Sequence, residues 1–290
     1  MDKITGTGVA LITPFNEDFS IDFVSLEKLI NHQIDGGIDY LVVMGTTGES
    51  VVLSKSEKKK IVDFCKKINA GRLPIILGLG SNNTFALVEE IKSTDFDGID
   101  GVLSVSPYYN KPTQDGIYLH YKMIAEVCPL PIILYNVPGR TASNITAETT
   151  LCLANDFDNI VAVKEASGDL QQIAEIIEKR PDNFLVLSGD DGLTPKMIEM
   201  GGDGVITVIG QSHPQIFSDM VRAGLAGDFE KANQLHDKLN PIYEPLYIDG
   251  NPAGIKATLN IMGICKNVLR PPLVGVTEET YNNLKRFIEH

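Results

Sequence analysis

Eight short apolar runs recur along this chain, and they constrain its fold more than any other feature. They start 20 to 34 residues apart, and each is apolar almost throughout, as in parallel strands that are covered on both faces. The runs are GVALIT (8–13), YLVVM (40–44), PIILG (74–78), GVLSV (101–105), PIILY (131–135), IVAVK (160–164), FLVLS (184–188) and GVITV (204–208). We therefore expect one parallel sheet within residues 1–211.

Segments with the apolar spacing of helices fill the gaps between these runs. The sequence SKSE at 54–57 is a capping-box pattern, and paired glycines at 36–37 and 201–202 precede the next strand, as at helix ends. A strand followed by a helix about eight times predicts a (β/α)8 barrel, the TIM barrel fold. The main alternative is a doubly wound sheet, but no G-x-G-x-x-G pattern follows the first run.

Residues 212–290 are expected to form an added C-terminal helical subdomain. Amphipathic patterns lie around Phe217–Leu225 and across Ile255–Leu259. We expect Asn251 and Pro252 to be the N-cap and first residue of the second of these helices, and Gly263 to end it. No linker or low-complexity segment separates this part from the barrel.

Charge and cysteine spacing narrow the class of protein. A net charge of −13 argues against a nucleic-acid partner, because binding the phosphate backbone requires a positively charged surface. The apolar run Val9–Ile12 is too short for a signal peptide or a membrane span, so we expect a cytoplasmic protein without a membrane partner. The four cysteines show no C-x-x-C spacing and the histidines are scattered, so we expect reduced thiols and no metal site.

Polar residues gather directly after the runs, where the active sites of such barrels lie. These segments hold hydroxyls, amides, one lysine and one arginine, which suits a small anionic substrate. They include GTTGES (45–50), GLGSNN (78–83), SPYYNKP (106–112), YNVPGR (135–140), KEASGD (164–169), SGDDG (188–192) and IGQS (209–212).

Lys164 is the most informative of these residues. It closes a buried run, and strand alternation is expected to place Ile160, Ala162 and Lys164 on one face. If that face is the barrel interior, burial favours the neutral amine, which imine formation with a carbonyl requires. The alternative is a lysine whose stem packs while its ammonium group reaches water.

Two further side chains are candidates beside Lys164. Tyr135 ends the neighbouring run, and adjacent strands lie about 5 Å apart, so its phenol is in reach to exchange protons with the amine. Arg140 follows a Pro-Gly turn that is expected to bring it over the barrel mouth, where a guanidinium suits a carboxylate. The alternatives are a tyrosine that caps the core and a solvated loop arginine.

Two loops complete the candidate site. Tyr108 and Tyr109 are expected to point opposite ways in an extended loop, so that one faces the site and the other a subunit contact. The glycines of GTTGES are expected to bring backbone N–H groups and two hydroxyls close to a carboxylate. Simple loop packing and a plain turn before a capped helix are the alternatives.

Three of these segments resemble the motifs of the pyruvate-dependent class I aldolase family. They are GTTGE at 45–49, YNVP at 135–138 and KEASGD at 164–169, and the resemblance spans essentially the whole chain in motif order. It implies an enzyme that joins pyruvate to aspartate semialdehyde in lysine and diaminopimelate biosynthesis. It also implies that no cofactor is needed and that the chain forms a homotetramer built from dimers.

The resemblance also implies a role for each site residue. Lys164 forms a Schiff base with pyruvate, and Tyr135 shuttles protons. Thr46 and Tyr109 complete a proton relay to solvent, with Tyr109 contributed across the dimer interface by the neighbouring subunit. Four residues are implied to contact substrates: Thr47, Ile206, Arg140 and Gly189. Of these, Thr47 binds the carboxylate of pyruvate and Arg140 binds the carboxylate of the semialdehyde.

Sibling activities remain as alternatives within this family. N-acetylneuraminate lyases carry serine at the position of Thr46 and lack arginine at that of Arg140, and sugar-acid aldolases as a rule also lack that arginine. This chain has threonine at position 46 and arginine at position 140, which favours the reaction with the semialdehyde. A catalytically silent barrel is a remoter alternative, and the intact set of Lys164, Tyr135, Thr46 and Tyr109 speaks against it.

One pocket departs from the family pattern. Members inhibited by lysine use a dimer-interface pocket with histidines and a glutamate. Three residues here match that pocket: Ser50, Asn82 and Tyr108. Lys55 and Lys58 occupy the histidine positions and Ala86 the glutamate position, so cationic lysine should be repelled. We expect weak or absent lysine feedback.

Overall fold

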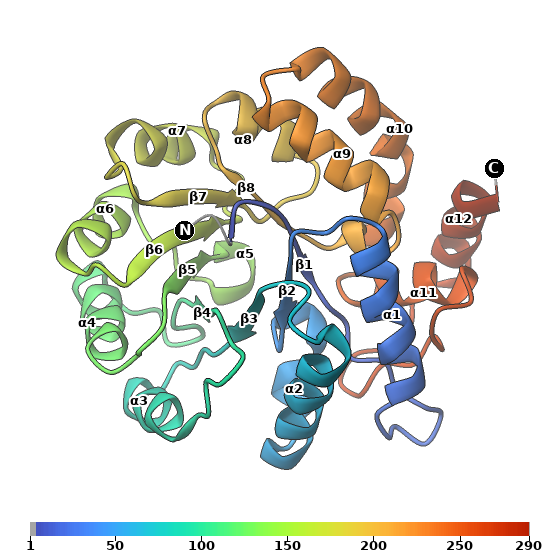
Figure 1. Cartoon of the computed structure of the whole chain (residues 1–290), viewed down its shortest axis with the longest axis horizontal. Coiled ribbons are helices and arrows are strands. Elements are labelled where there is room, and N and C mark those ends of the chain that lie inside the picture. The colour runs from blue at the N-terminus through green and yellow to red at the C-terminus, as the bar shows by residue number, and fades with distance from the viewer. Residues whose placement is uncertain (1–3, 290) are drawn as a thin grey trace.

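The structure, a computed structural model, describes residues 4–289. Eight parallel strands pair in chain order and close into a barrel (Figure 1). The strands are β1 (Gly6–Ala10), β2 (Tyr40–Val43), β3 (Ile75–Gly78), β4 (Gly101–Val105), β5 (Ile132–Asn136), β6 (Ile160–Glu165), β7 (Leu185–Ser188) and β8 (Gly204–Thr207). Each predicted run contributes a strand, and the (β/α)8 fold is confirmed.

A helix follows each strand and covers the outside of the barrel. These helices are α1 (Phe23–Asp35), α2 (Lys55–Asn69), α3 (Thr84–Ser93), α4 (Gln114–Ala125), α6 (Ala147–Asp156), α7 (Leu170–Lys179), α8 (Thr194–Glu199) and α9 (Pro214–Leu225). The capping box is confirmed, because the Ser54 side chain accepts from the Glu57 amide and the Glu57 carboxylate accepts from the Ser54 amide. After α1 and α8, Gly37 and Gly201 adopt positive φ angles of 78° and 104°, as at helix ends.

The core has an inner layer inside the barrel and an outer layer under the helices, and Ile160 lies in the outer layer, not in the inner layer as predicted. Ile133, Ala162 and Ile206 belong to the cluster that fills the barrel, whereas Ile160 packs with the helices outside it. The prediction that Ile160 shares a face with Lys164 is therefore wrong. The pairing of β5 with β6 shifts by one residue at Ile160–Ala162, and such a bulge reverses the alternation.

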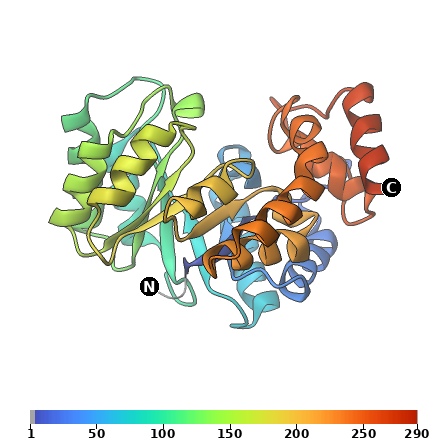
Figure 2. The ribbon, with the colours of Figure 1, turned by 90° about the horizontal axis from the view of Figure 1, so that it is seen from above.

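The chain continues beyond the barrel as three helices, α10 (Phe229–Tyr247), α11 (Ala253–Ile261) and α12 (Glu278–Glu289). Figure 2 shows α11 and α12 standing to one side of the barrel. Helix α9, in contrast, packs against β1 and β8 and is the eighth barrel helix. The expected boundary at residue 212 falls before this helix, and we propose that the added subdomain begins after α9.

The start of α11 differs from the prediction. Pro252, not Asn251, is the N-cap, and the cap makes no side-chain hydrogen bond. The amide of Asn251 instead reaches Thr47, described below. At the other end Gly263 has a φ of 68° and its N–H binds the Asn260 carbonyl, so the predicted helix end is confirmed.

Across residues 4–289, no helix is both long and apolar enough to cross a membrane. The same residues contain no group of three or more His, Cys, Asp or Glu side chains arranged to hold a metal ion. All four cysteines are free thiols, and only Cys152 is exposed.

Candidate active site

Lys164 and Tyr135 meet at the C-terminal ends of two adjacent strands. Their Cα atoms are direct partners in the pairing of β5 with β6, and both side chains are buried. The Lys164 Nζ atom lies 4.4 Å from the centroid of the Tyr135 ring. Within residues 4–289, no carboxylate lies within ion-pair distance of Lys164. The structure thus brings together a buried amine and a phenol, and the described part of the chain gives the amine no counter-ion.

Gly189 leaves room beside the lysine side chain. A Cβ atom at this position would lie 3.0 Å from Lys164 Cε and 2.7 Å from Ala166 Cβ. The backbone is fixed there, because the Gly189 amide donates to the Glu165 carbonyl at 2.7 Å. Only glycine therefore fits without moving its neighbours. Since Ser188 pairs with Val205, Gly189 is level with Ile206, whose side chain packs in the same inner cluster as Tyr135.

The GTTGES segment forms two short 3-10 helices, η2 (Thr46–Gly48) and η3 (Ser50–Val52). Thr47 is buried and Thr46 is exposed, and their amides open the turn, where no acceptor lies within the helix. Gly48 also has a packing reason to be glycine, beside the expected approach of its backbone to a ligand. A Cβ atom there would lie 3.1 Å from the Leu11 carbonyl oxygen, so Gly48 packs against the end of β1.

Thr47 and Arg140 are linked by a residue from the C-terminal region. The Asn251 amide nitrogen Nδ2 donates to Thr47 Oγ1 at 2.9 Å, and Arg140 Nη2 donates to the Asn251 carbonyl at 3.4 Å. The expected Pro-Gly turn is a one-turn helix, α5 (Pro138–Thr141). Asn251 lies 204 residues from Thr47 in the chain, and the sequence carries no local signal of this contact.

A cavity of about 910 Å³ opens beside these residues. Thr46, Tyr135 and Arg140 line it, together with Lys55, Lys58 and Ala86. Ser50 and Tyr108 also border the cavity, and Asn82 donates to the Tyr108 carbonyl at 3.2 Å. Thr46, Tyr135 and Arg140 therefore share one continuous space with the residues that match the lysine pocket.

The two tyrosines of the SPYYNKP loop differ in exposure, as predicted. Tyr108 is half-buried and lines the cavity, whereas Tyr109 is 87% exposed. The loop is not extended, however, because Tyr109 has a φ of 77°. Within the described chain Tyr109 makes no side-chain hydrogen bond to Thr46 or Tyr135, so a single subunit does not assemble the expected relay.

Glu49, the acidic residue of the GTTGE motif, has a buried partner that sequence reasoning missed. The Lys256 ammonium donates to Glu49 Oε1 at 2.5 Å and to the Val268 carbonyl at 2.8 Å. It also lies 4.2 Å from the Phe15 ring centroid. Both charged side chains are buried. Burial lowers the pKa of Lys256, and the Glu49 charge opposes that shift.

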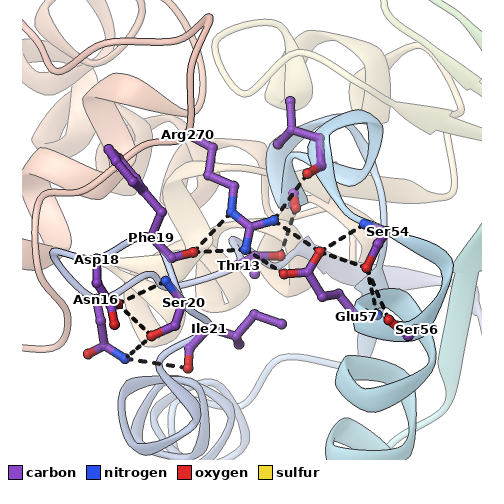
Figure 3. A network of polar contacts seen from close by, with 12 residues as sticks. Thr13, Asn16, Asp18, Phe19, Ser20, Ile21, Ser54, Ser56, Glu57 and Arg270 are labelled. Carbon is purple, nitrogen blue, oxygen red and sulfur yellow. Dashed lines mark hydrogen bonds and ion pairs between the residues drawn. The ribbon is translucent and has the colours of Figure 1, made fainter.

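Arg270 extends this network to the start of α2 (Figure 3). Its guanidinium contacts both oxygens of Glu57, at 2.5 and 3.1 Å, and the Phe19 carbonyl at 2.8 Å. Its amide donates to Glu49 at 3.1 Å. Hydrogen bonds from Arg270, and after them from Ser54, lower the pKa of Glu57 to about 2. The C-terminal region thus holds the loop that carries Thr46 and Thr47.

A second network was also missed, on the outer side of β5 and β6. The Asn136 amide donates to both Glu165 oxygens, at 3.0 and 3.1 Å. The Ser167 amide and Gln172 Nε2 donate to the same carboxylate, at 2.8 and 3.0 Å. Burial raises the pKa of Glu165. Because Asn136 and Glu165 directly follow Tyr135 and Lys164, these bonds fix the strand ends that carry the candidate catalytic pair.

Sequence comparison assigns relatives to the whole chain. The model of the dihydrodipicolinate synthetase family matches residues 3–290. The 4-hydroxy-tetrahydrodipicolinate synthase of Flavobacterium psychrophilum is 52% identical over 287 residues, which cover 99% of this chain and 98% of that protein. The enzyme of the same name from Thermotoga neapolitana is 42% identical, covering 97% and 96% of the two chains.

Solved structures give the same result. The dihydrodipicolinate synthase of Aquifex aeolicus superimposes with a TM-score of 0.95 at 40% identity, over 99% of this chain and 97% of that one. The corresponding enzyme of Thermotoga maritima gives a TM-score of 0.96 at 39% identity, over 99% and 98%.

Proposed function

The chain belongs to the dihydrodipicolinate synthetase family, and we propose that it condenses pyruvate with L-aspartate 4-semialdehyde to 4-hydroxy-tetrahydrodipicolinate. It is a carbon–carbon lyase of lysine and diaminopimelate biosynthesis. The observation that carries the mechanism is Lys164, a buried amine that lacks a carboxylate partner within residues 4–289 and lies 4.4 Å from the ring of Tyr135.

We assign the nucleophile to Lys164. Its amine adds to the ketone carbon of pyruvate, and the carbinolamine loses water to give an imine. Loss of a methyl proton yields an enamine, which attacks the aldehyde carbon of the second substrate. The amino group of that substrate then displaces Lys164 as the ring closes, and the free lysine is restored. Protons must move at each stage, and Tyr135 is the adjacent phenol that carries them.

Four residues are assigned to substrate binding. The Thr47 hydroxyl and the amides that open η2 suit the pyruvate carboxylate, and the main chain at Ile206 lies beside the keto acid. The Arg140 guanidinium at the cavity suits the carboxylate of the semialdehyde. Gly189 keeps open the space beside Lys164 that the second substrate needs, since a side chain there would contact Cε.

Assembly is part of the proposal, because the proton relay is incomplete in one chain. Tyr109 is 87% exposed, and Thr46 is exposed at the cavity. We assign the relay to Tyr135, Thr46 and the Tyr109 of a neighbouring subunit in a dimer, and pairs of dimers to a homotetramer. Sedimentation at assay concentrations separates dimer from tetramer.

The compartment we propose is the cytoplasm. The four cysteines are unpaired, as is usual in a reducing compartment. Burial raises the pKa of Cys65 and of Cys265 to about 12, so these thiols stay protonated and unreactive at neutral pH.

We expect weak or absent inhibition by lysine. Two ammonium groups, Lys55 and Lys58, line the cavity, and Ala86 offers no carboxylate there. A third cation entering this space meets repulsion without a partner. The measurement is initial rate against lysine concentration, and half-maximal inhibition below a millimolar concentration would contradict the expectation.

Product formation with competing aldehydes tests the activity. The enzyme should turn over pyruvate with aspartate semialdehyde at a kcat/KM well above that with sugar aldehydes or N-acetylmannosamine. A higher kcat/KM for a sugar aldehyde would instead assign a sibling aldolase activity. Pyruvate binding without turnover of any aldehyde would assign a catalytically silent barrel.

A further inference from the structure

Asn251 enters the candidate site from the segment between α10 and α11. Its side chain donates to Thr47 at 2.9 Å, and its backbone carbonyl accepts from Arg140 at 3.4 Å. Thr47 and Arg140 are the residues assigned to the two substrate carboxylates. One asparagine therefore contacts both carboxylate-binding residues, through different groups.

The Asn251 side chain has no other structural use in the described chain. It does not cap α11, which begins after Pro252. Its Oδ1 atom is buried and makes no hydrogen bond within residues 4–289, although buried amide oxygens are nearly always partnered. The hydrogen bond to Thr47 is thus the contact that the side chain makes.

The direction of this hydrogen bond decides what the Thr47 hydroxyl can do. A hydroxyl has one proton to donate and two lone pairs to accept, and an ionised carboxylate only accepts. Because Thr47 Oγ1 accepts from Asn251, its own proton stays available for a substrate carboxylate. A residue at position 251 that accepted from Thr47 would take this proton away.

Both flanks of Asn251 are anchored to the barrel. On the α10 side, the Tyr247 hydroxyl donates to buried Asp191 at 2.5 Å, and Asp191 also accepts from the Ile209 amide at 2.8 Å. On the α11 side, Lys256 pairs with Glu49. These contacts fix the position from which Asn251 reaches Thr47.

We propose that Asn251 is a positioning residue for both substrates: its side chain orients the Thr47 hydroxyl as a donor to the pyruvate carboxylate, and its carbonyl holds the Arg140 guanidinium. This inference rests on the proposed function. It makes the helical subdomain part of the active site, although the nucleophile lies on the barrel.

The test compares Asn251→Ala and Asn251→Asp with the wild-type enzyme. Asn283→Ala is the matched control, because Asn283 is an exposed asparagine on α12. Two quantities are measured: the pyruvate concentration that gives half-maximal borohydride trapping at Lys164, and the KM for each substrate. Thermal unfolding confirms that each variant is folded.

In Asn251→Ala, the half-maximal pyruvate concentration should rise about tenfold, while the KM for the semialdehyde changes less, because the carbonyl that binds Arg140 remains. Asn251→Asp should raise the pyruvate concentration further, despite its matching shape. Its carboxylate accepts the Thr47 proton and repels the substrate anion. Asn283→Ala should match the wild type.

Two results would overturn the inference alone. One is an Asn251→Asp enzyme that traps pyruvate as the wild type does, which would reduce the contact to packing. The other is an Asn251→Ala enzyme in which both KM values are unchanged. Absence of any Lys164 adduct in the wild-type enzyme would instead overturn the proposed function, and this inference with it.

Discussion

Two lysines of this chain are buried to a similar degree but have different neighbours. Lys164 is 5% exposed and Lys256 is 0% exposed, and each Nζ atom lies above an aromatic ring, at 4.4 and 4.2 Å from its centroid. Lys256 lies 2.5 Å from the Glu49 carboxylate, whereas Lys164 has no such partner among the described residues. The neighbours, not the burial, separate the two.

The difference follows from the cost of burying charge. A buried ammonium is tolerated when a carboxylate and further acceptors surround it, and Lys256 has both Glu49 and the Val268 carbonyl. Such a lysine is a structural cation. Lys164, which has no carboxylate partner within residues 4–289, is the nucleophile that we propose, and the Tyr135 ring beside it lines the cavity. The GTTGE loop contributes to both regions, with Thr47, which we assign to the pyruvate carboxylate, and Glu49, which pairs with Lys256.

The largest effect is expected from Lys164→Met. Removing the proposed nucleophile should lower kcat at least about a thousandfold. Thermal stability should hold, because Lys164 makes no ion pair within residues 4–289. Steady-state rates and melting curves measure both. A variant that keeps a tenth of the activity would place the nucleophile elsewhere.

The matching substitution at the other lysine, Lys256→Met, should lower the free energy of unfolding. It leaves the Glu49 carboxylate buried and unpaired, which costs about 3–5 kcal/mol in unfolding free energy. Denaturant unfolding measures this loss, and adding Glu49→Gln should recover part of it. Equal stability of the single variant and the wild type would refute a structural role for the pair.

Tyr135→Phe tests the role that we propose for the hydroxyl group beside Lys164. The ring above Lys164 stays and only the hydroxyl is removed, so the fold should hold while kcat falls about a hundredfold or more. Single-turnover trapping with pyruvate should slow as well, because imine formation needs proton transfer. A normal rate would mean that another group carries the protons.

The smallest effect is expected at Arg270, on the edge of the Lys256 region. Hydrogen bonds from Arg270, and after them from Ser54, lower the pKa of Glu57 to about 2. The interaction between Arg270 and Glu57 therefore stabilises the fold above about pH 4.5 and is lost as the pH falls toward 2. The free energy of unfolding of the wild type should therefore exceed that of Arg270→Gln by on the order of 1 kcal/mol at neutral pH. Unfolding curves measured at several pH values should show that this difference in unfolding free energy becomes smaller as the pH falls. A difference that stays constant would contradict an ion pair between Arg270 and Glu57.

Much of the fold was predictable because its signal is local. Continuous apolar runs with helical segments between them specify a barrel, and the SKSE pattern specifies the start of α2. The placement of Ile160 was not predictable, because its bulge depends on how β6 pairs with β5. Nor was the place of α9 predictable, since α9 packs against β1 and β8 through contacts that the sequence does not display.

In the candidate site, too, some residues were predictable from the sequence and others were not. Lys164 and Tyr135 were predictable as a pair, because they end consecutive strands that lie side by side. Asn251 and Lys256 were not, because they reach the GTTGE loop across 204 and 207 residues of chain. Asn251 next to a proline suggested a helix cap, whereas its side chain is used on Thr47.

The most direct test of the contrast between the two lysines is peptide mapping after borohydride reduction with pyruvate. The account predicts one pyruvate-derived mass increment per chain, on the peptide that contains Lys164, and no increment on the peptide that contains Lys256. An increment on Lys256, or an unmodified Lys164, would contradict it.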